Sequence, residues 1–262
     1  GFVGIPGFLL VLFGLYKMLL GEYPTNYEIK FAYYSLICTF IAGFFLVFFL
    51  IIIGAITQSA IGIGFGIPAC FLVLLEPSMV PSCIVLMGSF LAFSNAMLSF
   101  KDIIKVDLIY AYTGRIIGSL LAMPLIFFTL GTKNYLIIFG ILLLIATYMS
   151  IKKWNIIANK KNITIAGTAS GLMGTLIGIG GPPMAIVYQN SSARKVVATL
   201  NMFFGIGALF SVILFVYFDI INIPEVMKSI YLAPALIIGT YIGRRKFIRE
   251  FVDRNLKNLI VT

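Results

Sequence analysis

The chain has 262 residues, of which 61% are hydrophobic and 11% are charged, and its mean hydropathy is +1.08. Soluble domains carry about 25% charged residues, so the composition excludes a soluble globular protein. The net charge is +10, which in a membrane protein is typical of basic cytoplasmic loops, so we expect no nucleic-acid partner. The sequence contains no histidine, which excludes imidazole proton relays, histidine-ligated metals and histidine-based catalytic triads.

Apolar stretches recur along the chain, and most of them are close to the ~20 residues that a membrane helix needs. A first apolar helix is expected at Gly1–Leu20, within a segment of residues 1–30. Further transmembrane helices are expected at Phe31–Ile53, Val80–Phe100, Leu108–Leu130, Asn134–Ile151, Val196–Phe218 and Val226–Gly243. The sequence therefore predicts an all-α, polytopic membrane protein.

Two other apolar stretches are interrupted by glycine and proline. Gly54–Leu75 contains the first break, GIGFGIP (Gly62–Pro68), and Ile163–Tyr188 contains the second break, GIGGPP (Gly178–Pro183). Glycine relaxes the backbone and proline removes a hydrogen-bond donor, so neither stretch is one straight helix. Non-helical backbone at membrane depth requires protein or a watery cavity around it. We therefore predict two re-entrant helical hairpins that turn at the breaks.

The two breaks are related by an offset of 116 residues, because Ile61–Gly64 and Ile177–Gly180 share the sequence IGIG. Internal repeats with interrupted segments at corresponding positions are typical of transporters. We predict a first repeat over 31–130 and a second over 134–243, each with three crossings and one hairpin. A basic segment follows at 244–262.

The positions of the basic residues predict the orientation. They include Lys101, Lys105, Lys152, Lys153, Lys160, Lys161, Arg194, Lys195, and the cluster that follows Gly243. Placing these residues in the cytoplasm makes the two hairpins dip from opposite faces, and an odd number of crossings per half inverts the second repeat. We expect a multi-pass protein of the plasma (cell inner) membrane with cytoplasmic basic loops.

The breaks are the strongest candidates for a binding site. A proline at the start of a helix is well tolerated, and a helix N-terminus presents unpaired N–H groups and a positive dipole end to an anion. If the halves are inverted, both N-termini point into one cavity near the midplane; the alternative is that the breaks are packing kinks. The candidate substrate-binding residues here are Gly62, Gly64, Phe65, Gly66, Pro68, Gly178, Gly180, Gly181, Pro182 and Pro183.

Polar side chains near the breaks extend this candidate set. Gln58, Ser59 and Thr175 are candidate hydrogen-bond donors to an oxyanion, with bonding to carbonyls of their own helix as the alternative. Asn95 and Asn201 are either site amides or contacts between helices. Arg115 is the one charge well inside a span, eight residues after Asp107, and is therefore a functional candidate; a carboxylate pair or snorkelling to the interface is the alternative.

At these residues the chain resembles the sulfite exporter TauE/SafE family of anion permeases. The matching motifs are GIGFGIPA (62–69), GLMGTLIGIGGPPM (171–184), VVATLNM (196–202) and LIIGTYIGRR (236–245), and the resemblance runs from about Phe31 to Arg254. It implies a two-half membrane fold and transport, often export, of sulfite, sulfonates or related organosulfur anions. An importer, or a carrier of another small anion, is the alternative.

Two departures from the family pattern affect the expectations. Phe65 stands where the family usually has glycine, which is expected to narrow or reshape that side of the site. Gly1–Leu20 is an additional apolar segment at the front, which is either a separate N-terminal helix or, read after the terminal LKNLIVT, a final helix numbered out of order.

Enzymatic motifs are missing from the sequence. It has no HExxH, GxSxG, P-loop or carboxylate pair within a span, so we expect no enzyme activity and no cofactor or metal. The expected partners are the lipid bilayer and a small anionic substrate, and the oligomeric state is open, with a homodimer as one arrangement. The nine acidic residues lie in loops, at span ends or in terminal segments, so we predict electrogenic export without a coupling ion.

Overall fold

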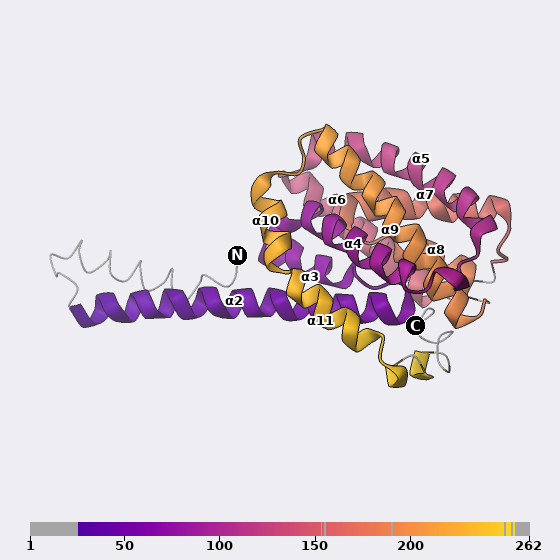
Figure 1. The fold of residues 1–262 in the computed structure, drawn as a ribbon. Helices are drawn as coiled ribbons and strands as arrows, with labels where there is room; N and C mark the ends of the chain where they lie inside the picture. Colours follow the sequence, from indigo (N-terminus) through magenta and orange to yellow (C-terminus); the bar gives the residue numbers. More distant parts are fainter. Residues whose placement is uncertain are drawn as a thin grey trace.

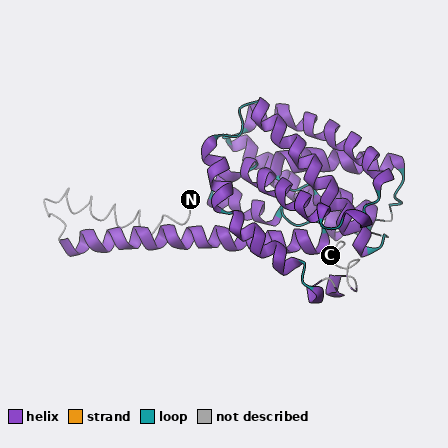
Figure 2. Ribbon diagram, viewed as in Figure 1, coloured by secondary structure: helices purple, strands orange, loops and turns teal. Residues whose placement is uncertain are grey.

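The computed structural model describes residues 26–254 except positions 153, 155, 190, 249 and 253, and it describes side chains from residue 41 onward. The predicted helix at Gly1–Leu20, with both of its interpretations, lies outside the described residues. Within the described part of the chain every regular element is a helix, and short loops connect them (Figure 2). The predicted all-α class is confirmed.

The described elements are α2 (Asn26–Ile61), α3 (Ile67–Leu75), α4 (Ser82–Met97), α5 (Lys105–Thr129), α6 (Lys133–Ile151), α7 (Lys160–Ile177), α8 (Gly181–Tyr188), α9 (Ala193–Tyr217), α10 (Ile223–Tyr231) and α11 (Ala233–Gly243). Two short 3₁₀ turns, Pro77–Met79 and Phe100–Asp102, flank α4. Four helices are long and apolar enough to cross a membrane: α5, α6, α9, and the part of α2 from Ile41 to Ile61. The bent pair α10–α11 makes up to five, so the chain is a polytopic membrane protein.

The predicted boundary between Ile53 and Gly54 is wrong. Helix α2 continues through both residues to Ile61, and Figure 1 shows it as a single long helix that projects from the bundle. One glycine in a helix costs only about 1 kcal/mol, which is too little to end it. Gly54 instead makes room for the returning chain, since a Cβ atom there would lie 2.6 Å from Cγ of Pro68.

Two other predicted spans differ from the helices observed. The predicted Val226–Gly243 span is two helices, α10 and α11, bent by 44°. Pro234 lies at the start of α11, where it has no N–H to continue the hydrogen bonding of α10. The predicted Val80–Phe100 span is shortened to the 16 residues of α4, which begins directly after Pro81.

Helices from the two predicted repeats pack against each other. Gly167 of α7 lies against Ala111 of α5, and Gly171 lies against Arg115, so α5 and α7 run parallel. On the other side of the bundle, Gly239 of α11 lies against Ala55 of α2. Small residues at these contacts let the backbones approach closely, as is typical of helix pairs in membranes.

The α2–α11 contact is also parallel, because Gly243 lies against Ile56 and Ser59, farther along both helices. Figure 1 shows α11 beside the C-terminal part of α2. At the offset of 116, the end of α2 corresponds to α7, so each of these equivalent helices packs parallel to a helix of the other half. The division into two repeats and the inversion of the halves across a membrane stay predictions.

Candidate functional site: a cavity between the two helix breaks

The first break turns the chain back along the end of α2. Gly62 and Gly64 have φ angles of +80° and +114°, and α3 begins at Ile67 with Pro68 as its second residue. Gly64 has no room for a side chain, because a Cβ atom would lie 2.6 Å from Oγ1 of Thr57. The predicted turn near Gly64 and the proline at the start of the short helix are therefore both observed, but the first arm of the predicted hairpin is the end of the long helix α2 and not a separate re-entrant arm.

Gln58 holds the first break in place. Its Nε2 group donates to the Gly62 carbonyl at 3.0 Å, and its Oε1 atom accepts the Phe65 N–H at 3.3 Å. Nε2 also donates to Oδ1 of Asn201 at 3.1 Å, while Nδ2 of Asn201 donates to the Val197 carbonyl at 2.9 Å. The polar groups of Gln58 and Asn201 thus bond within the protein and tie the first break to α9.

The second break has the same form. Helix α7 ends at Ile177, Gly178 has φ of +74°, and α8 begins at Gly181. The Ser170 hydroxyl donates to the Gly180 carbonyl at 2.6 Å, which fixes the turn against α7. The Gln189 side chain at the end of α8 donates to the Trp154 carbonyl before α7, so α8 returns toward the start of α7 as the predicted hairpin requires.

Both breaks line one cavity of about 360 Å³, which is within the usual range for small-molecule sites. The predicted site residues that line it are Gln58, Gly64, Phe65, Gly66, Arg115, Gly178, Gly180, Gly181 and Pro182. The remaining walls are largely apolar and include Ile84 and Val85 of α4 and Phe204 and Ala208 of α9. Within the described part of the chain, the amide N–H groups of Gly66 and Gly181 have no acceptor, as expected at helix N-termini.

Among the described residues, Arg115 is the only charged one that lines the cavity, and it is 2% exposed. It lies ten residues after Lys105, or about 15 Å along α5 at 1.5 Å per residue, about half of the hydrocarbon thickness of a bilayer. Its Nη1 group donates to the Ser170 carbonyl at 2.6 Å, and its guanidinium carbon lies 5.8 Å from the centre of the Phe203 ring.

No carboxylate among the described residues lies within 4.0 Å of this guanidinium, and its Nε atom has no hydrogen-bond partner. Neither the carboxylate pair nor the snorkelling expected as alternatives is observed. A buried charge is costly when no opposite charge balances it, so an anion in the cavity would lower the free energy of this side chain.

Three glycines leave the space that the Arg115 side chain occupies. A Cβ atom on Gly174, Gly180 or Gly207 would lie close to Arg115 atoms, at 3.1 Å or less. Gly174 and Gly207, together with Ser170, are functional candidates that sequence reasoning missed. The regular spacing of small residues in α7 indicates a close helix neighbour, but it does not show which side chain of that neighbour fills the space.

The structure places the other predicted site residues outside the cavity lining. Gly62 lies against Val197, while Pro68 and Pro183 are buried next to the lining residues. Ser59 accepts a hydrogen bond from Nδ2 of Asn95 at 2.9 Å, and Oδ1 of Asn95 in turn accepts one from Arg244 at 3.2 Å.

Thr175 bonds to the hydroxyls of Ser119 and Ser211 at 2.9 and 2.8 Å. Ser59, Asn95 and Thr175 thus join helices by hydrogen bonds to neighbouring side chains rather than to carbonyls of their own helix.

Comparison with known protein families identifies the chain. The sequence model of the family described as sulfite exporter TauE/SafE matches residues 46–262, which is most of the chain. Comparison with curated proteins and with solved structures gives no match. The family match and the long apolar helices agree on an integral membrane protein with several spans. The protein belongs to the sulfite exporter TauE/SafE family.

Proposed function

We propose that this protein exports small sulfur-containing anions, such as sulfite or sulfonates, and that the anion binds between the two helix breaks. The observation that carries this proposal is the cavity itself. It brings together the N-terminal ends of α3 and α8 and a buried guanidinium that forms no ion pair with a carboxylate of the described residues. An anion bound there would accept hydrogen bonds from groups that have no acceptor within the described part of the chain.

An empty site leaves buried hydrogen-bond donors without acceptors, which costs free energy. A buried donor without an acceptor costs about 1–3 kcal/mol, and more when it is charged. Hydrogen bonds between a cation and an oxyanion are stronger than neutral ones, so the same groups favour an anionic ligand over a neutral one. The largely apolar walls lower the local dielectric, which strengthens these interactions.

The membrane potential of a cell favours the export of an anion over its import. A monoanion that leaves a cell with a negative interior gains about 2.3 kcal/mol per 100 mV. This free energy sustains roughly a fifty-fold gradient, because 1.4 kcal/mol corresponds to tenfold. Export then requires no coupling ion. We place the basic loops, including Lys160 and Arg194, on the cytoplasmic side from which the substrate enters.

The test is a flux assay in proteoliposomes with a panel of anions: sulfite, an alkyl sulfonate, sulfate, a carboxylate and chloride. Wild-type protein is expected to carry sulfite or the sulfonate, and Arg115→Met is expected to lower that flux about 10- to 100-fold. Lys133→Met is the matched control, since it removes one positive charge from the exposed start of α6. If the protein carries none of these anions, the proposal is refuted.

A further inference from the structure

The two breaks are equivalent in sequence but differ in their hydrogen bonding. At the offset of 116, Phe65 corresponds to Gly181 and Gln58 corresponds to Gly174. In the first break, the Phe65 N–H donates to the Gln58 side chain at 3.3 Å. In the second break, the corresponding Gly181 N–H has no acceptor within the described part of the chain.

The glycine at position 174, where the first half has Gln58, also explains where the guanidinium of Arg115 lies. Because position 174 is glycine, no side chain of α7 fills the place that Gln58 fills in the first half. The Arg115 guanidinium of α5 occupies that space instead, next to Gly174 and Gly180. In the first break a neutral amide of the same helix therefore accepts the Phe65 N–H, and the open N–H belongs to Gly66; in the second break the corresponding Gly181 N–H is open and lies beside a cation from a neighbouring helix.

Ser170 connects these two features. Its backbone carbonyl accepts a hydrogen bond from Nη1 of Arg115 at 2.6 Å, and its hydroxyl donates to the Gly180 carbonyl at 2.6 Å. Ser170 is fully buried. The Gly180 carbonyl and the Gly181 N–H belong to the same peptide group, and in a trans peptide these two bonds point in opposite directions. A hydroxyl that holds the carbonyl therefore turns the N–H away from α7.

We infer that Ser170 is a positioning residue for the substrate. It aims the Gly181 N–H into the cavity beside the Arg115 guanidinium, so that the charged group of the anion binds at the second break. This inference rests on the proposed function and deepens it. Within the described part of the chain, the Ser170 hydroxyl makes the hydrogen bond that holds the Gly180–Gly181 peptide, and glycine on both sides of this peptide permits other backbone angles once that bond is removed.

The experiment compares sulfite transport by wild-type protein with that of three serine variants in proteoliposomes. Ser170→Ala removes the positioning hydroxyl, whereas Ser170→Thr keeps it. Ser89→Ala is the matched control, because Ser89 is also fully buried and donates one hydrogen bond to a backbone carbonyl, that of Leu86 at 2.7 Å.

Ser170→Ala is expected to raise the KM for sulfite roughly tenfold, the effect of one charge-assisted hydrogen bond, with a maximal rate close to that of wild type. Ser170→Thr and Ser89→Ala are expected to keep the wild-type KM. The concentration of sulfite that gives half of the maximal thermal stabilisation of the purified protein is expected to shift by the same factor as KM. A merely structural role would lower the melting temperature without sulfite and leave this concentration unchanged.

The outcomes separate this inference from the proposed function. If wild-type protein carries sulfite and Arg115→Met impairs it, but Ser170→Ala behaves as Ser89→Ala does, then Ser170 is not a positioning residue and the proposed function stands. A Ser170→Thr variant as weak as Ser170→Ala also overturns the inference. If wild-type protein neither carries nor binds any anion of the panel, the proposed function fails and the inference fails with it.

Discussion

Gly174 of α7 and Arg115 of α5 fit together so closely that a Cβ atom on Gly174 would lie less than 3.0 Å from the Arg115 guanidinium. Even a methyl group at position 174 would therefore displace the guanidinium, which is the only charge among the described residues that line the cavity. This relationship links a sequence feature, the glycine in GLMG, to the electrostatics of the site.

Gly174→Ala is accordingly expected to lower sulfite flux about tenfold or more, because the guanidinium loses its position beside the second break. Gly140→Ala in α6 is the matched control, since a Cβ atom there has nothing within 4 Å. Ala is also the better helix former by up to about 1 kcal/mol, so the control is expected to be at least as stable as wild type. Equal flux in both variants would show that the position of Arg115 does not matter.

Arg115→Met is expected to leave the stability of the substrate-free protein unchanged or to increase it. Wild-type protein buries a charge whose Nε atom lacks a partner, and such a group costs about 1–3 kcal/mol relative to an apolar side chain of similar shape. The measurement is thermal unfolding in detergent without and with sulfite. A large loss of stability without sulfite would mean that Arg115 is a structural residue.

Gly64→Ala is expected to abolish transport, because the first break requires both the positive φ angle of Gly64 and the absence of a side chain there. The φ of Gly64 is +114°, and an added Cβ atom would clash with Thr57. Gly131 is the matched control: its φ is +80°, but nothing lies within 4 Å of an added Cβ atom.

Gly131→Ala then measures backbone strain alone, about 1–2 kcal/mol of stability. Flux and unfolding of both variants separate strain from damage to the cavity, and a Gly64→Ala protein that transports normally would contradict the assignment of the first break.

The two helix breaks, and the short helices α3 and α8 that follow them, are the part of the site that could be predicted best from the sequence. Glycine and proline change backbone preferences locally, so the positions of both breaks, and the prolines near the starts of α3 and α8, could be predicted from the sequence. The position of Arg115 well inside a long apolar helix could be predicted too, whereas its burial against α7 could not.

Contacts between distant helices could not be predicted in this way. From the sequence, Ser59 and Thr175 are expected to donate hydrogen bonds to a ligand. In the structure, Ser59 accepts a hydrogen bond from the Asn95 amide of α4, and Thr175 bonds to serine hydroxyls of other helices. The continuity of α2 was missed because hydrophobicity alone does not separate one long helix from a span and a hairpin arm. Ser170 was missed because the role of a small polar residue depends on the carbonyl that it reaches.

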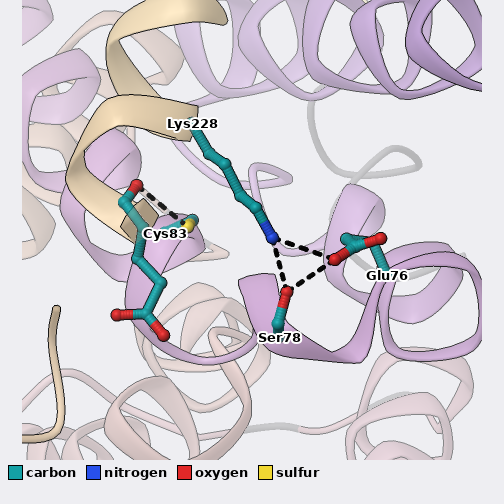
Figure 3. A network of polar contacts seen from close by, with 5 residues as sticks. Glu76, Ser78, Cys83 and Lys228 are labelled. Atoms are coloured by element: carbon teal, nitrogen blue, oxygen red, sulfur yellow. Dashed lines mark hydrogen bonds and ion pairs between the residues drawn. The ribbon is translucent and has the colours of Figure 1, made fainter. Parts of the chain in front are cut away.

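The ion pair between Glu76 and Lys228 is expected to make stability depend on pH. Nζ of Lys228 on α10 lies 2.9 Å from Oε1 of Glu76 and 2.7 Å from Oγ of Ser78, as Figure 3 shows. The hydrogen bonds from Ser78 and from Lys228 lower the pKa of the Glu76 carboxyl below its ordinary value. A lowered pKa stabilises the folded state above the ordinary carboxyl pKa, and this contribution is lost as the pH falls through the lowered value.

Glu76→Gln is therefore expected to lower stability near neutral pH by about 1 kcal/mol or less, since both side chains are partly exposed, and the difference from wild type is expected to shrink below about pH 4. Unfolding in detergent as a function of pH measures this difference. Glu250→Gln, in an exposed pair at 3.8 Å from Lys246, is the control. If the difference in stability between Glu76→Gln and wild type grew on acidification, the Glu76–Lys228 pair would not be its cause.

Transport is expected to follow the membrane potential. None of the described helices carries a carboxylate in the middle of a candidate span; Asp107 and Glu225 lie in the first turns of α5 and α10. Proteoliposomes with the potential and the pH gradient clamped separately test this prediction. Accumulation of sulfite that is driven by a pH or Na⁺ gradient at zero potential, with no response to potential alone, would show that a coupling ion is required.

The most direct measurement is calorimetric titration of purified protein with sulfite, for wild type and Arg115→Met, with Lys133→Met as the control. We expect saturable binding to wild type and to Lys133→Met, and binding to Arg115→Met that is weaker by about 10- to 100-fold. Equal affinity of wild type and Arg115→Met for sulfite would contradict the claim that the buried guanidinium and the two helix breaks form the anion site.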